Sequence, residues 1–176
     1  MAHTLILKGR PGIGKTTLIK AAIQQLADRA GGFYTEEILG PGGRKGFRLI
    51  TLTNRSVVMA HVDLDTRVRI GRFGVNLAAI DEVGVTALRD AIEQKPIVII
   101  DEIGKLELAS PQFQNLVIKA IGSSKLVLAT AMKDNHPWLA ALQSLPLVTV
   151  WEVTLKNRTP LIAQVLEWID QRAEKR

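Results

Sequence analysis

Apolar residues follow two different spacings, which alternate from one end of the chain to the other. Ile97–Ile100 and Lys125–Ala131 are almost continuously apolar, as expected of strands covered on both faces within a parallel sheet. Lys15–Ala30 instead repeats apolar residues every three or four positions, which is typical of an amphipathic helix. Strands that alternate with helices predict an α/β fold with a mostly parallel central sheet flanked by helices.

The first strand and helix precede a segment with a different period. We expect a strand over His3–Lys8 and a helix over Lys15–Ala30 that stops at Gly31-Gly32. Beyond the two glycines, short apolar stretches are separated by glycine, proline and asparagine, which is typical of hairpins. The expected strands are Phe33–Leu39, Phe47–Thr53 and Ser56–Val62. They predict an antiparallel meander directly after the first helix.

The rest of the chain returns to the alternation of helix and strand. Helices are expected over Val83–Gln94, from Ser110-Pro111 to about Ile121, from Pro137 and from Thr159-Pro160, with a strand over Leu147–Thr154 before the last of them. No linker or repeat interrupts this pattern. We therefore expect one domain spanning residues 1–176, a size at which a chain buries enough surface to fold without disulfides.

The amino-acid composition excludes several classes of protein. The 176 residues include no cysteine, which excludes disulfides and thiolate metal sites, and the three histidines are too far apart for a zinc site. No apolar run approaches the ~20 residues that a membrane span needs. The amino terminus differs from a secretion signal, because Lys8 interrupts its apolar segment early. We expect a cytoplasmic protein with no membrane partner, and we favour a monomer.

The formal net charge of +6 is concentrated in one segment. The charged residues between positions 40 and 72 are Arg44, Lys45, Arg48, Arg55, Arg67, Arg69 and Arg72, against Asp63 and Asp65. Such a cluster is able to hold a nucleic-acid backbone or a polyphosphate. It also fits a solvated hairpin, and with only 5% aromatic residues few rings are present on which bases could stack. The composition favours the solvated hairpin or a small phosphate, and nucleic-acid binding stays open.

A complete phosphate-loop motif follows the first strand. It reads Gly9-Arg10-Pro11-Gly12-Ile13-Gly14-Lys15-Thr16, with Thr17 next, and it stands between a predicted strand and a predicted helix. That context directs backbone N–H groups and the positive helix end at a phosphate. Lys15 is placed for the β- and γ-phosphates, and the Thr16 hydroxyl for Mg²⁺. The motif predicts a nucleotide-phosphate site.

Two carboxylates end the aliphatic strand Ile97–Ile100. A phosphate-loop protein needs an acidic residue at the tip of a neighbouring strand, on the metal side, and Asp101 fits. Glu102 is then free to polarise a water for in-line attack on the γ-phosphorus. An alternative in which both acids only cap a loop is disfavoured, because the Lys15 motif independently requires an acid here. Thr130, at the next strand's tip, is a candidate contact for the γ-phosphate or the water, although threonine is ordinary in sheets.

Four further segments carry a family resemblance. They are Gly32–Ile38, Ile70–Leu77, Asp101–Leu108 and Val153–Arg158, and their order and spacing agree across nearly the whole chain. Together with the two motifs, they resemble the small P-loop nucleoside-triphosphatase family first known from thermophiles, whose human member is called the cancer-related nucleoside-triphosphatase. Leu106 stands where methionine is expected in that family, a change that conserves volume.

The resemblance implies a RecA-like fold and slow, Mg²⁺-dependent hydrolysis of ATP, GTP, CTP and UTP to diphosphate and phosphate. Carried over to this chain, Gly9–Thr16 would bind the triphosphate. Asp101 and Thr16 would serve the metal, and Glu102 would activate the water. The expected catalytic residues are therefore Lys15, Asp101 and Glu102.

The resemblance also draws attention to three cations. Lys105 and Arg158 would place positive charge near the reacting phosphate or against the base. Lys105 is equally able to pair with Glu107 or another surface carboxylate. Arg10, inside the loop, would line the mouth of the phosphate site.

Two other classes of function stay open. A nucleotide or small-molecule kinase shares the chain length and the phosphate loop, and the cationic segment could supply its mobile cover. A nucleotide-dependent switch or nucleic-acid-binding module is the second, although the chain has no Asn-Lys-x-Asp motif for reading guanine. Free phosphate without any acceptor would indicate hydrolysis, and salt-dependent binding would indicate a nucleic-acid partner.

Overall fold

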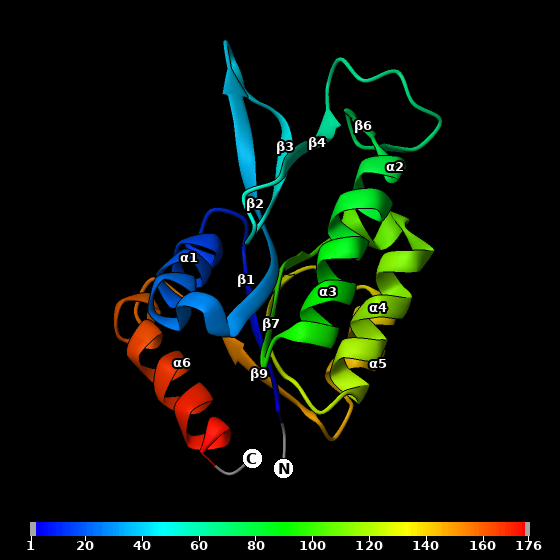
Figure 1. Ribbon diagram of the computed structural model, residues 1–176. Coiled ribbons are helices and arrows are strands. Elements are labelled where there is room, and N and C mark those ends of the chain that lie inside the picture. The colour runs from blue at the N-terminus through cyan, green and yellow to red at the C-terminus, as the bar shows by residue number, and fades with distance from the viewer. Residues whose placement is uncertain (1–2, 175–176) are drawn as a thin grey trace.

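Helices cover both faces of one sheet in the computed structural model, which describes residues 3–174 (Figure 1). In this part of the chain the strands are β1 (Thr4–Gly9), β2 (Ala30–Gly40), β3 (Gly43–Thr51), β4 (Ser56–His61), β5 (Arg69–Ile70), β6 (Phe73–Val75), β7 (Ile97–Ile103), β8 (Leu126–Met132) and β9 (Val148–Glu152). The α-helices are α1 (Lys15–Leu26), α2 (Leu77–Ala79), α3 (Thr86–Gln94), α4 (Pro111–Gly122), α5 (Pro137–Gln143) and α6 (Arg158–Ala173). Residues 1–2 and 175–176 of the expected domain lie outside the described residues.

The sheet is mixed, with the order β5-β6-β4-β3-β2-β7-β8-β1-β9. Neighbouring strands are parallel along β2-β7-β8-β1-β9. They are antiparallel along β5-β6-β4-β3-β2. This confirms the α/β class and the meander after the first helix. The expectation of a mostly parallel sheet holds only for the half from β2 to the edge strand β9, because the meander joins the same sheet through β2 and forms the other half.

Alternate residues of the parallel strands divide the core between the two faces. Leu5 and Leu7 of β1 pack with α1 and α6, whereas Ile6 packs on the opposite face with α3 and α4. Figure 1 shows the same division, with the hairpin of β2 and β3 projecting beyond the helices. Such two-sided burial explains why β7 and β8 are apolar at nearly every position. No helix among residues 3–174 is long and apolar enough to cross a membrane.

The first helix ends earlier than the sequence indicated. It stops at Leu26, a 3-10 turn follows over Ala27–Arg29, and Gly31 and Gly32 lie inside β2. The prediction that these glycines terminate the helix was therefore wrong. Gly32 serves close packing instead: its φ is 116°, and a Cβ there would lie 2.1 Å from the carbonyl oxygen of Ile99.

The helix expected over Val83–Gln94 begins earlier in the chain than Val83. Its first turn starts after Asn76, whose Oδ1 accepts a hydrogen bond from Ala79 N at 3.0 Å, and a π-helical turn over Ile80–Val85 leads into α3. Gly84 obscured the pattern, because glycine is a poor helix former. Here it lets the turn approach the sheet, since a Cβ would lie 2.8 Å from Leu49 Cδ1.

Replacing Gly32 with alanine should destabilise the fold by at least ~2 kcal/mol, because the new methyl group would meet rigid backbone and the φ is left-handed. Urea unfolding measures the change. The matched control is Gly122→Ala at the end of α4, where a Cβ meets nothing within 4 Å, so its stability should stay within ~1 kcal/mol of the parent. Equal effects of the two substitutions would contradict this account of Gly32.

Candidate active site

The glycine-rich loop connects β1 to α1 at the carboxyl end of the parallel strands. Gly12 and Gly14 have φ values of 74° and 110°, a region that residues with a Cβ rarely adopt, and Gly14 is the residue before the first helical turn. Leu18 N donates to Gly14 O at 3.0 Å, which closes that turn. The two glycines therefore let the backbone curl around an open space at the start of α1.

Lys15 is held inside this loop although it carries a charge. Its side chain is only 5% exposed, and Nζ donates to the carbonyl oxygens of Gly9 at 2.9 Å and Arg10 at 3.1 Å. A third contact, 3.2 Å to Oε2 of Glu102, is an ion pair. Two carbonyls and a carboxylate thus satisfy the buried ammonium, as a buried charge requires.

Asp101 lies at the centre of the buried part of the site. Its side chain is fully buried and accepts hydrogen bonds from Thr16 Oγ1 at 2.9 Å, from Thr35 N at 3.3 Å and from Thr130 Oγ1. Burial raises the pKa of Asp101 to about 6, against the opposing effect of the hydrogen bonds from Thr130 and Thr16. Three elements, α1, β2 and β8, therefore meet on one carboxyl group.

Sheet topology explains why these residues converge. β8 pairs with β1 on one side and β7 on the other, so the ends of all three strands meet at one edge. Neighbouring residues of a regular strand point to opposite faces. The β7–β8 register shifts between Ile100 and Ile103, however, so Asp101 and Glu102 lie outside the regular ladder. Both acids can then serve the same loop.

A second buried carboxyl group lies near Glu102. Glu107, in a 3-10 turn after β7, is 4% exposed and accepts a hydrogen bond from Gly104 N at 3.2 Å. Burial, and then the charge of Glu102, raise the pKa of Glu107 to about 8, so this carboxyl group is neutral at pH 7. Lys105 does not pair with it; Lys105 Nζ lies 2.7 Å from Oδ2 of Asp134 instead.

A cleft of ≈ 520 Å³ extends from the glycine-rich loop to the β2–β3 hairpin. One part of it is lined by Glu102 and, from the loop region, by Pro11, Gly12, Gly14, Lys15, Thr16 and Thr17. The other part is lined by side chains that sequence reasoning did not assign to a site, namely Lys20, Glu36, Glu37, Arg44 and Phe47. The available signals were the adjacent pair of glutamates in a strand directly after a phosphate-loop helix and the place of Arg44 in the cationic segment.

The remaining predicted cations lie on the other side of the loop or away from it. Arg158, the first residue of α6, donates from Nη1 to Ile13 O at 3.4 Å. Arg10 and Ile13 line a cavity of ≈ 320 Å³ with the loop between β9 and α6. Lys105 lines neither of these two cavities. The structure thus brings Arg10 and Arg158 to the loop and leaves Lys105 in an exposed ion pair.

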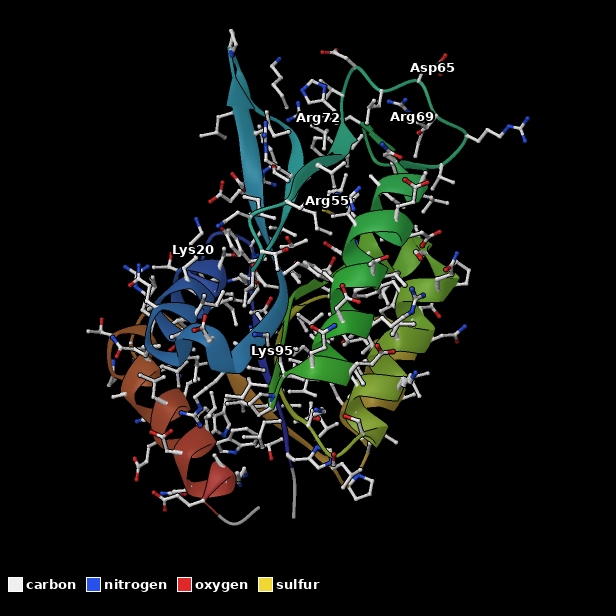
Figure 2. The ribbon with its side chains drawn as sticks, viewed as in Figure 1. Lys20, Arg55, Asp65, Arg69, Arg72 and Lys95 are labelled. Atoms are coloured by element: carbon white, nitrogen blue, oxygen red, sulfur yellow. The ribbon has the colours of Figure 1, made fainter. Side chains whose placement is uncertain are left out.

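Several arginines of the cationic segment between residues 40 and 72 donate hydrogen bonds within that segment. Figure 2 shows Arg69 and Arg72 at the projecting end of the molecule and Arg55 nearer its body. Arg69 donates to Leu64 O at 3.1 Å and to Arg72 O at 2.8 Å, and Arg48 donates to Ser56 Oγ at 3.4 Å. These contacts fit the solvated-hairpin interpretation for Arg48 and Arg69.

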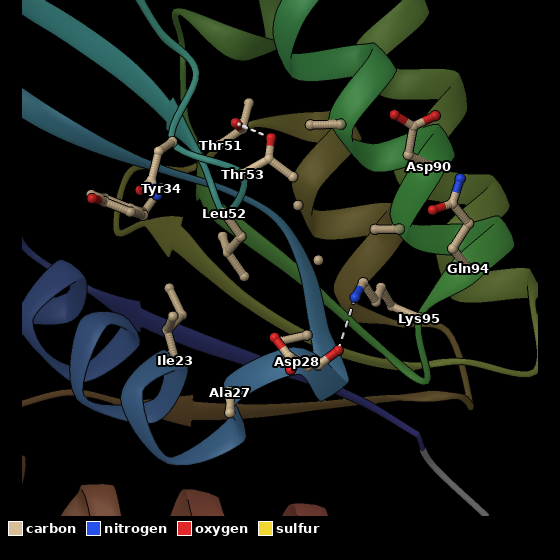
Figure 3. A pocket seen from close by; sticks show the side chains of 16 residues that line it. Ile23, Ala27, Asp28, Tyr34, Thr51, Leu52, Thr53, Asp90, Gln94 and Lys95 are labelled. Atoms are coloured by element: carbon tan, nitrogen blue, oxygen red, sulfur yellow. Dashed lines mark hydrogen bonds between the residues drawn. The ribbon is translucent and has the colours of Figure 1, made fainter.

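Another cavity, of ≈ 500 Å³, opens beside the first residues of β2 (Figure 3). Ile23 and Leu52 lie on one side of it, and Asp90 and Lys95 on the other, with Lys95 Nζ donating to Asp28 O at 2.9 Å. None of the residues predicted to form the site lines this cavity. The candidate chemistry is therefore concentrated around the glycine-rich loop.

Together, the mixed sheet, the loop before α1 and the buried acid beside it define an α/β protein with a polar site at the carboxyl ends of its parallel strands. The sequence matches a protein family described as NTPase over residues 4–166. It is 43% identical over 162 residues to the nucleoside-triphosphatase THEP1 of Thermotoga petrophila, covering 92% of this chain and 90% of that one.

Solved structures agree with this match. The crystal structure of THEP1 from Aquifex aeolicus superposes with a TM-score of 0.84 at 33% identity, covering 94% of this chain and 98% of the other. The solution structure of a human cancer-related nucleoside triphosphatase gives 0.79 at 29% identity, covering 97% and 98%. The chain therefore belongs to the NTPase family, which confirms the family and the enzyme class expected from its motifs.

Proposed function

We propose that this protein hydrolyses nucleoside 5′-triphosphates to diphosphate and phosphate, with Mg²⁺, low base specificity and slow turnover. The observation that carries the proposal is the 3.2 Å contact between Lys15 Nζ and Glu102 Oε2. It brings the cation suited to the β- and γ-phosphates and the carboxylate suited to activating water into one cleft. The names of the relatives support the class of reaction, and the slow turnover is what the family resemblance implies.

We further propose a RecA-like P-loop arrangement for this site. Its support is the position of β8 between β1, which leads into the glycine-rich loop, and β7, which carries Asp101. In this arrangement, the loop from Gly9 to Thr16 would surround the phosphates with its N–H groups, and Lys15 would exchange its carbonyl contacts for phosphate oxygens. Thr130 would act mainly through Asp101, because it is fully buried and donates to that carboxyl group.

The residues beside the loop fit a magnesium ion. Thr16 Oγ1 and Asp101 Oδ2, 2.9 Å apart, are hard oxygen donors of the kind that Mg²⁺ shares with substrate phosphates. Burial disfavours the Asp101 anion, and a neighbouring dication would compensate for that cost. When bound, Mg²⁺ would neutralise phosphate charge and hold the γ-phosphate in position. Thr16 and Asp101 would hold the ion, and Thr35 and Thr130 would keep Asp101 oriented through their hydrogen bonds.

Glu102 is proposed to accept the proton of the attacking water. It is 30% exposed and lines the cleft, so a water can reach it, whereas Asp101 is fully enclosed. The water oxygen would bond to the γ-phosphorus as the bond from that phosphorus to the β–γ bridging oxygen breaks. The proton would pass to Glu102 and then to solvent, and the diphosphate would leave with the bridging oxygen.

The cavity on the far side of the loop supports low base specificity. Ile13, Val153 and Leu155 are its apolar lining, and two of the charged residues that also line it, Lys133 and Glu152, already pair with each other at 2.7 Å. A base packed against the apolar side chains would be recognised weakly, because apolar contacts distinguish substrates less than hydrogen bonds do. We therefore assign the nucleoside end of the substrate to this cavity, with Arg10 at its edge.

Phosphate release from ATP, GTP, CTP and UTP, with and without Mg²⁺, tests the proposal. We expect all four to give diphosphate and free phosphate at rates within ~10²-fold, and removal of Mg²⁺ with a chelator to abolish release. Chromatography of the products would show whether phosphate goes to water alone. Diphosphate formed only when an acceptor is added would identify a kinase, and release that persists without Mg²⁺ would contradict the metal assignment.

A further inference from the structure

The phosphate cleft contains two cations that the proposed reaction has not used. Among the described residues that line it, the positively charged ones are Lys15, Lys20 and Arg44. Lys20 and Arg44 each pair with a glutamate of β2, Lys20 with Glu36 and Arg44 with Glu37. Both pairs are exposed to the cleft, where a triphosphate would offer more negative charge than a single carboxylate does.

Arg44 differs from Lys20 in carrying a buried donor without an acceptor among the described residues. Its Nη2 donates to Glu37, and its guanidinium lies 5.2 Å from the centre of the Phe47 ring. Its Nε is buried and finds no acceptor in the described part of the chain. The side chain as a whole is 36% exposed and lines the cleft, and a planar guanidinium is well suited to phosphate oxygens, which it can bind through two parallel hydrogen bonds.

The surroundings of Arg44 fix its backbone at the side of the cleft. Arg72 Nη2 donates to the carbonyl oxygen of Arg44, and the rings of Phe47 and Phe73 pack edge to face at 5.3 Å. These contacts hold the backbone of Arg44 in place, and they leave its guanidinium able to exchange Glu37 for another partner. Two of the cations considered from sequence, Arg158 and Lys105, contact Ile13 O and Asp134 instead.

We propose that Arg44 is the arginine that stabilises the transferring γ-phosphoryl group, supplied by the same chain. This inference rests on the proposed hydrolysis and deepens it. As the water attacks and the bridging bond breaks, Arg44 donates hydrogen bonds to the oxygens on which negative charge accumulates. Glu37 holds the guanidinium beside the cleft until this charge develops on the transferring group. No group is added to Arg44 and none leaves it.

The test compares Arg44→Ala with Arg48→Ala. Both arginines lie on β3, but Arg48 is exposed, donates to Ser56 and does not line the cleft. Single-turnover phosphate release at saturating Mg²⁺-ATP should fall by about 10²-fold for Arg44→Ala. Nucleotide affinity should stay within ~3-fold of the parent, since the arginine acts on the transition state. Arg48→Ala should match the parent in both measurements.

A second measurement separates a catalytic contact from a structural one. Mg²⁺-ADP with aluminium fluoride mimics the phosphoryl group in transfer, and it should bind the parent and Arg48→Ala more tightly than Mg²⁺-ADP alone. Arg44→Ala should lose that gain. Arg44→Lys keeps the positive charge but not the planar guanidinium, and it should lose most of the gain in affinity. If Arg44→Ala does not fold, Arg44→Lys is the variant that tests the proposal.

The inference would be overturned if a folded Arg44 variant released phosphate, and bound Mg²⁺-ADP with aluminium fluoride, at near-parental levels. So would a loss confined to nucleotide affinity. A parent protein that binds Mg²⁺-ATP but releases no phosphate would instead overturn the proposed hydrolysis, so the two failures are distinguishable.

Discussion

Glu102→Gln should bind Mg²⁺ and intact triphosphate with near-parental affinity and cleave it about 10³-fold more slowly. Glutamine keeps the shape of the side chain but cannot accept the proton of the attacking water. The 3.2 Å ion pair with Lys15 would become a weaker hydrogen bond, which leaves Lys15 at least as free to meet the phosphates. Binding titration beside single-turnover phosphate release would measure the two effects separately.

The matched control for this substitution is Glu107→Gln. Glu107 is buried, and its pKa of about 8 makes it neutral at pH 7, so an uncharged amide of the same shape replaces an uncharged acid. Turnover should stay within a few-fold of the parent. If Glu102→Gln cleaves at near-parental rate while Glu107→Gln does not, the water-activating role belongs to Glu107 rather than to Glu102.

Lys15→Ala should lose about 10³-fold or more in kcat/KM, because it removes the ammonium from the β- and γ-phosphates. Affinity for triphosphate should fall as well, which distinguishes this variant from Glu102→Gln. Isothermal titration and phosphate release would report the two losses, and circular dichroism would verify the fold. Lys119→Ala, an exposed lysine on α4, is the control for loss of a positive charge. Parental hydrolysis by folded Lys15→Ala would refute the loop assignment.

The parts of the site that the sequence predicted are those with local signals. The loop from Gly9 to Thr16 is specified by its own spacing and by the strand and helix beside it. Asp101 was placed through the need of a phosphate-loop protein for an acid at the tip of a neighbouring strand, and Glu102 through its position one residue beyond. The structure adds what no local pattern contains, the register shift after Ile100 that takes both neighbouring acids out of the regular ladder.

The opposite wall of the cleft was not predictable in the same way. Glu37 and Arg44 meet only because β2 and β3 pair with a register shift beyond Ile38, and that pairing is a long-range property of the sheet. Gly32 was misinterpreted for a related reason. A glycine that stops a helix and a glycine that admits a neighbouring carbonyl look alike in a sequence, and only the packing of Ile99 distinguishes them. The strands β5 and β6 are too short to produce a periodic signal.

Strand β2 belongs to both halves of the sheet, and this constrains which changes in chain length the protein can accept. Residues 30–33 pair with β7, and residues 33–40 pair with β3, so the strand joins the core to the hairpin without a break. One residue inserted or deleted between Gly32 and Thr35 would turn every later side chain to the opposite face. Glu37 would then leave Arg44, and Thr35 N would leave Asp101. The turn at Pro41-Gly42 is exposed, and a Cβ at Gly42 would meet nothing within 4 Å, so length variation in relatives should gather there and spare β2.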